Sequence, residues 1–203
     1  MVLRGFRYFS LMKNLFFALF LISLIISGCR SHYSQIVIKT ELGDITLKLY
    51  TDKAPVTTNN FLQYVHENRL KEATFYRTVT MDNQADNNIK IEVIQGGLFE
   101  DDHPKALSPI VHETTELTGI LHKDGVISMA RNEPGTATCE FFICIGDQPS
   151  LDYGGERNPD GQGFAAFGKV VKGMDVVHKI HESQADGQWL EPRIKILSVG
   201  LVN

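Results

Sequence analysis

Residues 36–49, IVIKTELGDITLKL, decide the fold class because apolar and polar side chains alternate on both sides of a short central turn. Ile36 and Ile38 precede the Glu41–Asp44 segment, and Ile45, Leu47 and Leu49 follow it. Every second residue of an extended chain points to the same face, so each run presents one apolar face. The stretch therefore predicts an antiparallel hairpin of two half-buried strands.

The rest of the chain adds further short strands and two helices. Pro55 favours the first turn of a helix whose apolar face is supplied by Phe61, Leu62 and Val65. We expect irregular chain over 80–88 and most of 100–118, a second helix over 172–181, and strands over 74–79, 89–94, 126–130, 140–145, 164–171 and 193–202. About eight short strands separated by turns predict a mainly β fold, a closed eight-stranded antiparallel barrel capped by two helices.

Composition excludes several classes of protein. The 203 residues contain 20 Lys and Arg against 24 Asp and Glu, with 43% hydrophobic and 22% charged residues, which argues against a disordered chain. Three basic residues and no acidic ones lie in residues 1–28, so residues 29–203 hold 17 basic and 24 acidic residues, a formal charge of −7. That charge argues against nucleic-acid binding, which requires a basic surface.

The N-terminus predicts an export signal. Lys13 precedes the apolar run Leu15–Ile26, whose 12 residues are fewer than the roughly 20 that a membrane-spanning helix needs. The run ends in Ile26-Ser27-Gly28-Cys29, which resembles a bacterial lipobox, where the cysteine is lipidated and becomes the first residue. The alternative is a plain signal or anchor helix in which Cys29 occurs by chance.

This pattern divides the chain into a signal peptide over 1–28, a lipid-anchored tether over 29–34 and a folded domain over 35–203. No acidic residue directly follows Cys29, and by lipoprotein sorting rules this favours the outer membrane of a diderm cell. We therefore expect an extracytoplasmic protein, held to the membrane by lipid on Cys29 and facing the periplasm.

The other two cysteines, Cys139 and Cys144, lie in one predicted strand. Five residues of strand span about 16 Å, whereas a disulfide needs Cα atoms within about 7 Å of each other. We therefore predict no bond between them and expect both to pack as small buried side chains.

The order of motifs resembles the cyclophilin family of peptidyl-prolyl isomerases, from Ile36 to Val199. The resemblance implies an eight-stranded barrel capped by two helices, a monomer, and proline-containing or unfolded polypeptides as partners. The matching motifs are GDI at 43–45, APVT at 54–57, NF at 60–61, FYR at 75–77, QGG at 95–97, SMAR at 128–131, EFFI at 140–143, FGKV at 167–170 and GMD at 173–175.

The resemblance also implies roles for individual residues. Arg77 matches the catalytic arginine, and Gln95 matches the glutamine that hydrogen-bonds the substrate carbonyl and steadies that arginine. Without the family pattern, Arg77 would be taken for a solvated strand residue. The other matches are Phe142 as the floor of the proline pocket, Leu151 and Phe164 as its walls, and Ala130 and Arg131 as residues whose backbone pairs with the substrate.

The chain departs from the family pattern before Gln95. Residues 80–90 lengthen the segment between Arg77 and Gln95, and Glu92 and Val93 stand where a Phe-Met pair is usual. Val93 can line an apolar pocket, but Glu92 cannot replace an aromatic wall. Either the insert shifts the strand register, with Met81 or Ile91 filling the gap, or the pocket is partly open.

Glu140 is a second departure, because it stands where a Gln is commoner and adds a charge that only accepts hydrogen bonds. An ion pair of Glu140 with Arg131 or Arg77 would orient the arginine. Glu140 and Val93 thus join the expected substrate-binding residues.

Other candidate sites are weaker. His178 and His181 lack a third metal ligand, and Asp82 and Asp86 lack the Gly and the final Glu of a calcium loop. No Ser or Cys nucleophile has a matching His and Asp order. We expect no metal and no cofactor.

The predicted function is a peptidyl-prolyl cis–trans isomerase that accelerates rotation of X–Pro bonds in exported proteins during folding. The alternative is a catalytically weak binding module or chaperone for proline segments on the same fold. The insert over 80–90, Glu92 and Glu140 favour that alternative.

Overall fold

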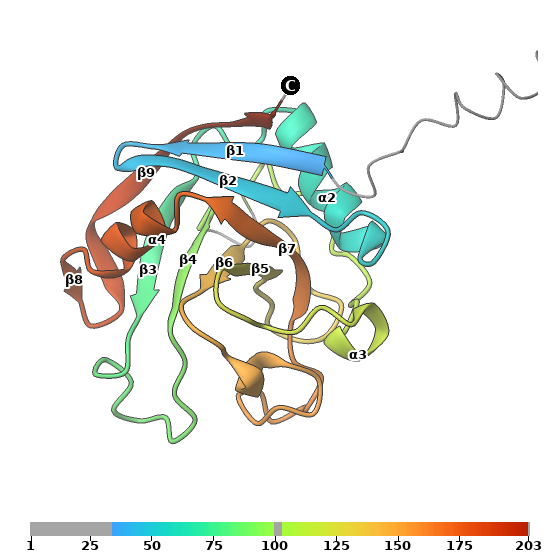
Figure 1. Cartoon of the computed structure of the whole chain (residues 1–203), viewed down its shortest axis with the longest axis vertical. Coiled ribbons are helices and arrows are strands. Elements are labelled where there is room, and N and C mark those ends of the chain that lie inside the picture. The colour runs from blue at the N-terminus through green and yellow to red at the C-terminus, as the bar shows by residue number, and fades with distance from the viewer. Residues whose placement is uncertain (1–33, 100–102, 203) are drawn as a thin grey trace, which may run out of the picture. The chain divides into compact units, whose positions relative to one another are not determined.

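Antiparallel pairing closes the strands of this chain into a ring, in a computed structural model that describes residues 34–99 and 103–202 (Figure 1). The strands are β1 (Ser34–Thr40), β2 (Gly43–Leu49), β3 (Thr74–Val79), β4 (Val93–Gly97), β5 (Val126–Met129), β6 (Phe141–Cys144), β7 (Ala165–Lys172), β8 (Ala185–Asp186) and β9 (Trp189–Leu201). The predicted signal peptide and Cys29 lie outside the described residues.

The order around the ring is β1-β2-β7-β5-β6-β4-β3-β9, and β9 pairs back onto β1. β8 pairs only with β9 and stands outside the ring. The predicted closed eight-stranded antiparallel barrel is therefore confirmed. Closure leaves each of the eight strands paired on both sides, which removes the open edges that promote aggregation.

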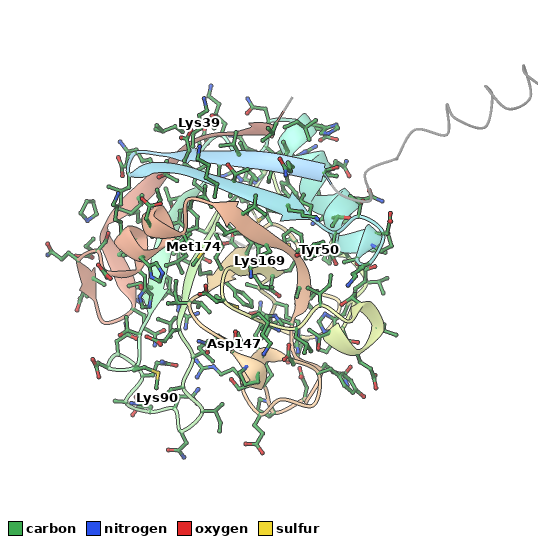
Figure 2. The ribbon with its side chains drawn as sticks, viewed as in Figure 1. Lys39, Tyr50, Lys90, Asp147, Lys169 and Met174 are labelled. Carbon is green, nitrogen blue, oxygen red and sulfur yellow. The ribbon has the colours of Figure 1, made fainter. Side chains whose placement is uncertain are left out.

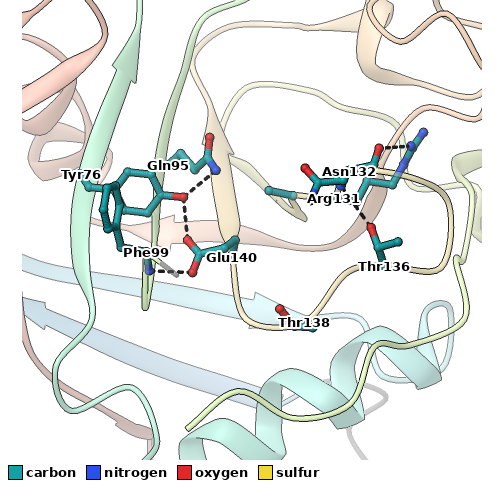
Figure 3. A pocket seen from close by; sticks show the side chains of 9 residues that line it. Tyr76, Gln95, Phe99, Arg131, Asn132, Thr136, Thr138 and Glu140 are labelled. Carbon is teal, nitrogen blue, oxygen red and sulfur yellow. Dashed lines mark hydrogen bonds between the residues drawn. The ribbon is translucent and has the colours of Figure 1, made fainter. Parts of the chain in front are cut away.

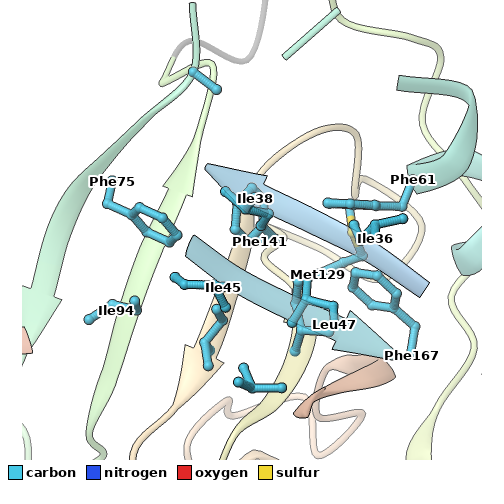
Figure 4. Packing of buried hydrophobic residues seen from close by; sticks show 14 of the residues in the cluster. Ile36, Ile38, Ile45, Leu47, Phe61, Phe75, Ile94, Met129, Phe141 and Phe167 are labelled. Atoms are coloured by element: carbon cyan, nitrogen blue, oxygen red, sulfur yellow. The ribbon is translucent and has the colours of Figure 1, made fainter. Parts of the chain in front are cut away.

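The inner face of the barrel carries the apolar residues that alternation assigned to it. Ile36 pairs with Leu47 and Ile38 with Ile45 across the β1–β2 hairpin, and all four side chains are fully buried. Phe141 of β6 packs edge-on against other rings, with its centroid 5.5 Å from Phe61 and 5.7 Å from Phe75 (Figure 4).

Two helices cover the barrel, as expected. α2 (Pro55–His66) lies against β7 and β9, and α4 (Met174–His181) lies against β2, β3 and β4. Glu113 accepts hydrogen bonds from the Val56 and Thr57 backbone N–H groups at 3.1 and 2.7 Å, which satisfies donors that a helix start leaves unpaired. Two short elements were not predicted, α3 (Thr115–Thr118) and a 3-10 turn over Pro149–Leu151.

β4 begins later than the sequence predicted, at Val93 instead of Ile89. The buried side chain of Gln84 accounts for the difference, because it supplies the partners that a strand would otherwise provide. Its Nε2 donates to the carbonyls of Thr80 and Ile91 at 2.7 and 2.8 Å, and its Oε1 accepts from the Ile91 N–H at 3.2 Å. The side chain thus replaces a β-ladder between residues 80 and 91.

Many charged side chains lie on the surface, among them Lys39, Lys90 and Asp147, which are exposed to solvent (Figure 2). Both Cys139 and Cys144 are buried free thiols, as predicted. Within residues 34–99 and 103–202, no helix combines the length and hydropathy needed to cross a bilayer.

Truncating Phe141 should destabilise the barrel strongly, because its side chain is fully buried between two other rings. We expect Phe141→Ala to lower the free energy of unfolding by about 3–5 kcal/mol in urea denaturation. Leu117→Ala serves as control, because Leu117 is 76% exposed, and it should change stability by less than about 0.5 kcal/mol. Similar losses in both variants would contradict this account of the core.

Candidate active site

A β-bulge in β3 places two neighbouring side chains on the outer face of the barrel. Phe75 pairs with Gly96 of β4, but the next pair is Arg77 with Gln95, so Tyr76 is an extra residue in β3. Strict alternation would turn Arg77 inward after an outward Tyr76. The bulge instead lets Arg77 share a face with Gln95, which is how bulges redirect side chains beside functional sites.

The register then forms one row of side chains across five strands. Arg77 pairs with Trp189 of β9 on one side and with Gln95 on the other. Gln95 pairs with Phe142 of β6, which pairs with Ser128 of β5. Directly paired residues in a sheet point to the same face, so this row brings together side chains that lie far apart in the sequence.

Two neutral amides hold the guanidinium of Arg77. Gln95 Oε1 accepts from Arg77 Nη1 at 2.8 Å, and Gln188 Oε1 accepts from Nε at 2.9 Å and from Nη2 at 2.6 Å. Gln188 is fixed in turn, because its Nε2 donates to the Asn83 carbonyl at 3.0 Å. The insert over 80–90 thus supports Arg77 through Gln188, a residue that no sequence pattern singled out.

The hydrogen-bond chain continues from Gln95 to a buried carboxylate (Figure 3). Gln95 Nε2 donates to Tyr76 Oη at 2.7 Å, and Tyr76 Oη donates to Glu140 Oε2 at 2.6 Å. Glu140 Oε1 accepts from the Phe99 backbone N–H at 2.9 Å. Gly97, with φ of +151°, leaves the space that the carboxylate fills, because a Cβ there would overlap it.

Burial shifts the pKa of the three ionisable groups that this hydrogen-bond network joins, Arg77, Tyr76 and Glu140. Desolvation lowers the pKa of Arg77, although arginine stays charged in proteins. Desolvation, followed by the charge of Glu140, raises the pKa of Tyr76, so its hydroxyl remains a donor. Desolvation also raises the pKa of Glu140, and the hydrogen bond from Tyr76 partly offsets this.

The expected pocket residues surround one cavity of about 280 Å³ beside this row. Its floor is apolar and its rim carries amide and guanidinium groups. The lining residues are Arg77, Ile91, Val93, Gln95, Ala130, Arg131, Asn132, Phe142, Leu151, Arg157, Asn158 and Phe164.

Phe142 and Phe141 face opposite sides of β6, as neighbouring residues of a strand do. Phe141 lies in the barrel core, whereas Phe142 belongs to a second apolar cluster with Val93 and Leu151. The rings of Phe142 and Phe164 meet edge to face with centroids 5.2 Å apart. These contacts fix the ring that forms the cavity floor.

Ile91, and not Met81, fills the place in the pocket wall where the family has a Phe-Met pair. Ile91 is 7% exposed and lines the cavity beside Val93, whereas Met81 is 46% exposed and lies outside it. Glu92 does not line the cavity, and its carbonyl accepts from the Ile145 N–H at 2.9 Å. The apolar wall is therefore continuous on this side.

The expected ion pair of Glu140 with Arg131 or Arg77 is wrong. Glu140 instead holds Tyr76 and lines a smaller polar cavity of about 110 Å³ next to the first. Arg131 forms two hydrogen bonds to Asp160, at 2.8 and 3.0 Å. The Ala130 N–H donates to the Glu140 carbonyl at 2.8 Å, so this N–H already has a partner within the protein.

The structure also corrects the expectation that no Ser matches a His and an Asp. His122 Nδ1 lies 2.7 Å from Asp152 Oδ1, and Nε2 lies 2.9 Å from Ser128 Oγ. Ser128 is fully buried and His122 is 1% exposed, so a substrate carbonyl cannot reach the hydroxyl. The His122 ring stacks on Phe142 at 5.8 Å, so this trio supports the cavity floor from behind.

Neither His178 and His181 nor Asp82 and Asp86 belong to a group of three metal-ligating side chains among the described residues. His181 Nε2 lies 3.0 Å from the Val79 carbonyl. Among residues 34–99 and 103–202, no three His, Cys, Asp or Glu side chains are grouped to hold a metal ion.

This chain is similar to proteins of one known family. Residues 35–201 match a family model described as cyclophilin type peptidyl-prolyl cis-trans isomerase. A peptidyl-prolyl cis-trans isomerase of Acinetobacter baylyi is 36% identical over 166 residues, covering 80% of each chain. Peptidyl-prolyl cis-trans isomerase B of Escherichia coli is 36% identical over 149 residues, covering 72% of this chain and 83% of that protein.

The fold also resembles a solved structure. The crystal structure of a cyclophilin type peptidyl-prolyl cis-trans isomerase from Cryptosporidium parvum superposes with a TM-score of 0.63 at 18% identity, covering 84% of this chain and 98% of that one. The same protein in the presence of the dipeptide Ala-Pro gives a TM-score of 0.62, also at 18% identity, covering 83% and 99%.

Glu140 should make stability depend on pH. Burial raises its pKa above the ordinary 4.5, so the folded protein binds this proton more tightly than the unfolded chain does. The corresponding stability is present below about pH 4.5 and is lost as pH rises through the raised pKa. Glu140→Gln removes the titration while keeping an acceptor for the Phe99 N–H.

We therefore expect the stability of Glu140→Gln relative to wild type to increase with pH, by at most about 1.4 kcal/mol per pH unit, in urea titrations from pH 4 to 8. Glu182→Gln, at an exposed position, is the control and should run parallel to wild type. Parallel curves for Glu140→Gln would contradict a raised pKa.

Proposed function

The chain belongs to the cyclophilin-type peptidyl-prolyl cis-trans isomerase family and is an isomerase of X–Pro bonds, and we propose that Arg77 and Gln95 carry the reaction. The observation that supports these roles is the row Arg77, Gln95 and Phe142 along an apolar-floored cavity of about 280 Å³. The cavity holds the proline ring on Phe142, and the guanidinium faces the rotating bond.

The reaction needs no nucleophile, because rotation breaks no covalent bond. The barrier of about 18–20 kcal/mol arises from the partial double bond between carbonyl carbon and nitrogen. In the twisted amide conjugation is lost and the nitrogen regains a lone pair. A fixed N–H donor binds that lone pair more strongly in the transition state than in the ground state, which is the condition for catalysis.

Arg77 has donors available for this task. A guanidinium carries five N–H groups, and three of them are used on Gln95 and Gln188. One N–H on each terminal nitrogen is left for the substrate. Because the partners are amides, no carboxylate competes for the charge of Arg77, and its position is still fixed.

Two of the features that favoured a binding module, the insert over 80–90 and Glu140, take part in building the site, and the third, Glu92, does not disturb it. Ile91 completes the apolar wall, Glu92 lies outside the cavity, and Glu140 orients Tyr76. The insert over 80–90 braces Arg77 through Asn83 and Gln188. A site that only bound proline segments would not need this support for a guanidinium.

We also propose that the enzyme acts on exported proteins as a monomer anchored by lipid on Cys29, facing the periplasm at the outer membrane. The support is the charge, the apolar run and the small residues that lead to Cys29, with no acid directly after it. The closed ring supports a monomer, since its eight strands offer no open edge to the strand of a second copy and β8, outside the ring, is only two residues long.

Replacing Arg77 should abolish most of the activity while leaving the fold intact. We expect Arg77→Ala to lower kcat/KM by about 10²–10³-fold in an NMR exchange assay on a short X–Pro peptide. Arg77→Lys should restore little, because an ammonium lacks the planar fork of donors. Gln188→Ala should cost roughly tenfold, since it removes one support of the guanidinium.

Leu117→Ala, at an exposed position that does not line the cavity, serves as control, and circular dichroism verifies the fold of each variant. Wild-type rates in Arg77→Ala would contradict the proposed role of Arg77. Full activity in Gln188→Ala would show that Gln95 alone positions the guanidinium.

The lipid anchor is tested with the full chain expressed in a diderm bacterium. Wild type should partition into the detergent phase of Triton X-114 and carry acyl chains on Cys29 in mass spectrometry. Cys29→Ser should carry no lipid and should retain the apolar run Leu15–Ile26, because the signal is no longer cleaved before residue 29. Ser31→Ala is the control and should stay in the detergent phase. A wild-type protein that carries no acyl mass on Cys29 would exclude lipidation at this cysteine.

A further inference from the structure

A cluster of aromatic side chains lies beside Arg77, on the side away from the proline pocket. Tyr76, Phe99 and Trp189, the one Trp of the chain, border a cavity of about 470 Å³. Trp189 is 52% exposed and Phe99 is 38% exposed. Large exposed aromatic rings that gather at a concave site mark a binding surface more often than scattered apolar residues do.

The β-ladder places this cavity next to the reacting bond. Trp189 of β9 pairs with Arg77, which pairs with Gln95, which pairs with Phe142. The aromatic cavity and the proline pocket therefore lie on opposite sides of Arg77, and both are lined by Arg77 and Gln95. An extended peptide that occupies one can reach the other, because residues on one face of a strand recur about every 6.8 Å.

The three rings are held in a fixed arrangement. Tyr76 meets Phe99 edge-on at 5.0 Å and stacks on Trp189 at 6.2 Å, and Phe99 meets Trp189 edge-on at 6.0 Å. The Arg193 guanidinium covers Phe99, with its central carbon 3.6 Å from the ring centroid. Such contacts orient the rings before a ligand arrives, which reduces the entropy lost on binding.

The backbone of Phe99 is strained at this position. Its φ is +76°, a conformation that bulky side chains rarely adopt. Glu140 maintains it by accepting from the Phe99 N–H, and the same carboxylate accepts from Tyr76. Strained residues that the surrounding structure holds in place cluster at functional sites.

We propose that this cavity is a second substrate subsite, which takes an aromatic or large branched apolar side chain within about three residues of the proline. The inference rests on the proposed function, because the substrate must already lie along Arg77. Edges and faces of aromatic rings favour another aromatic or an apolar group as the occupant. Continuity with Arg77 and Gln95 favours the substrate chain itself over a separate partner.

The test uses peptides that contain one X–Pro bond and a single Phe at one of the three positions before X or the three positions after Pro. The reference peptide carries Gly at all of these positions. NMR exchange gives kcat/KM for each, and the measured quantity is the ratio of Phe to Gly peptide. We expect wild type to prefer Phe about tenfold at one position or more, and Trp189→Ala to reduce that ratio to about twofold or less.

Two further variants control the result. Trp189→Phe keeps an aromatic ring and should retain most of the preference. Leu197→Ala, another exposed apolar residue of β9, should leave the ratio at its wild-type value. Because Trp189 is the chain's one tryptophan, its fluorescence in wild type should shift with the Phe peptide but not with the Gly peptide at equal saturation.

The outcomes separate this inference from the proposed function. No turnover of any peptide by wild type would overturn the proposed function itself. Turnover without a Phe preference, or a preference that Trp189→Ala retains, would overturn only the subsite. A stronger preference for Glu than for Phe would overturn the apolar subsite and assign the cavity to acidic side chains facing Arg193. A shift of Trp189 fluorescence with lipid vesicles, together with no shift with the Phe peptide, would also overturn the subsite. It would assign the aromatic surface to the membrane.

Discussion

The site depends on one irregularity of the backbone, the bulge that leaves Tyr76 without a partner in β4. It places Tyr76 and Arg77 on the same outer face, while Phe75 still points into the core. Without the extra residue, Arg77 would turn toward the apolar interior, where its charge would have no partner. The bulge therefore allows one strand to serve the barrel core and the site together.

Glu140 is the second constraint, because a buried carboxylate must be hydrogen-bonded to remain in place. Tyr76 and the Phe99 N–H meet that need, and the same bonds fix the two rings. Tyr76 in turn orients Gln95 by accepting a hydrogen bond from its amide, and Gln95 orients Arg77 by accepting one from the guanidinium. A single buried charge thus aligns Gln95 and Arg77 as well as one wall of the aromatic cavity, although it does not touch the Arg77 guanidinium.

Much of the fold followed from local pattern. Alternation in residues 36–49 identified the first hairpin and its buried face, and Pro55 marked the start of α2. The start of β4 could not be read this way, because the buried side chain of Gln84 replaces backbone pairing over residues 80–91. Family motifs identified Arg77, Gln95 and Phe142, but nothing local identified Gln188, which meets Arg77 from 111 positions away along the chain.

The sequence by itself determined the buried face of the first hairpin, since period-two alternation is a property of a regular strand alone. It also determined that Phe141 and Phe142 point to opposite sides. Only the tertiary structure decided the partners of Glu140 and the position of Trp189 beside Arg77, because both depend on register between strands. Register is set by closure of the whole barrel and by one bulge, and neither is encoded in any short segment.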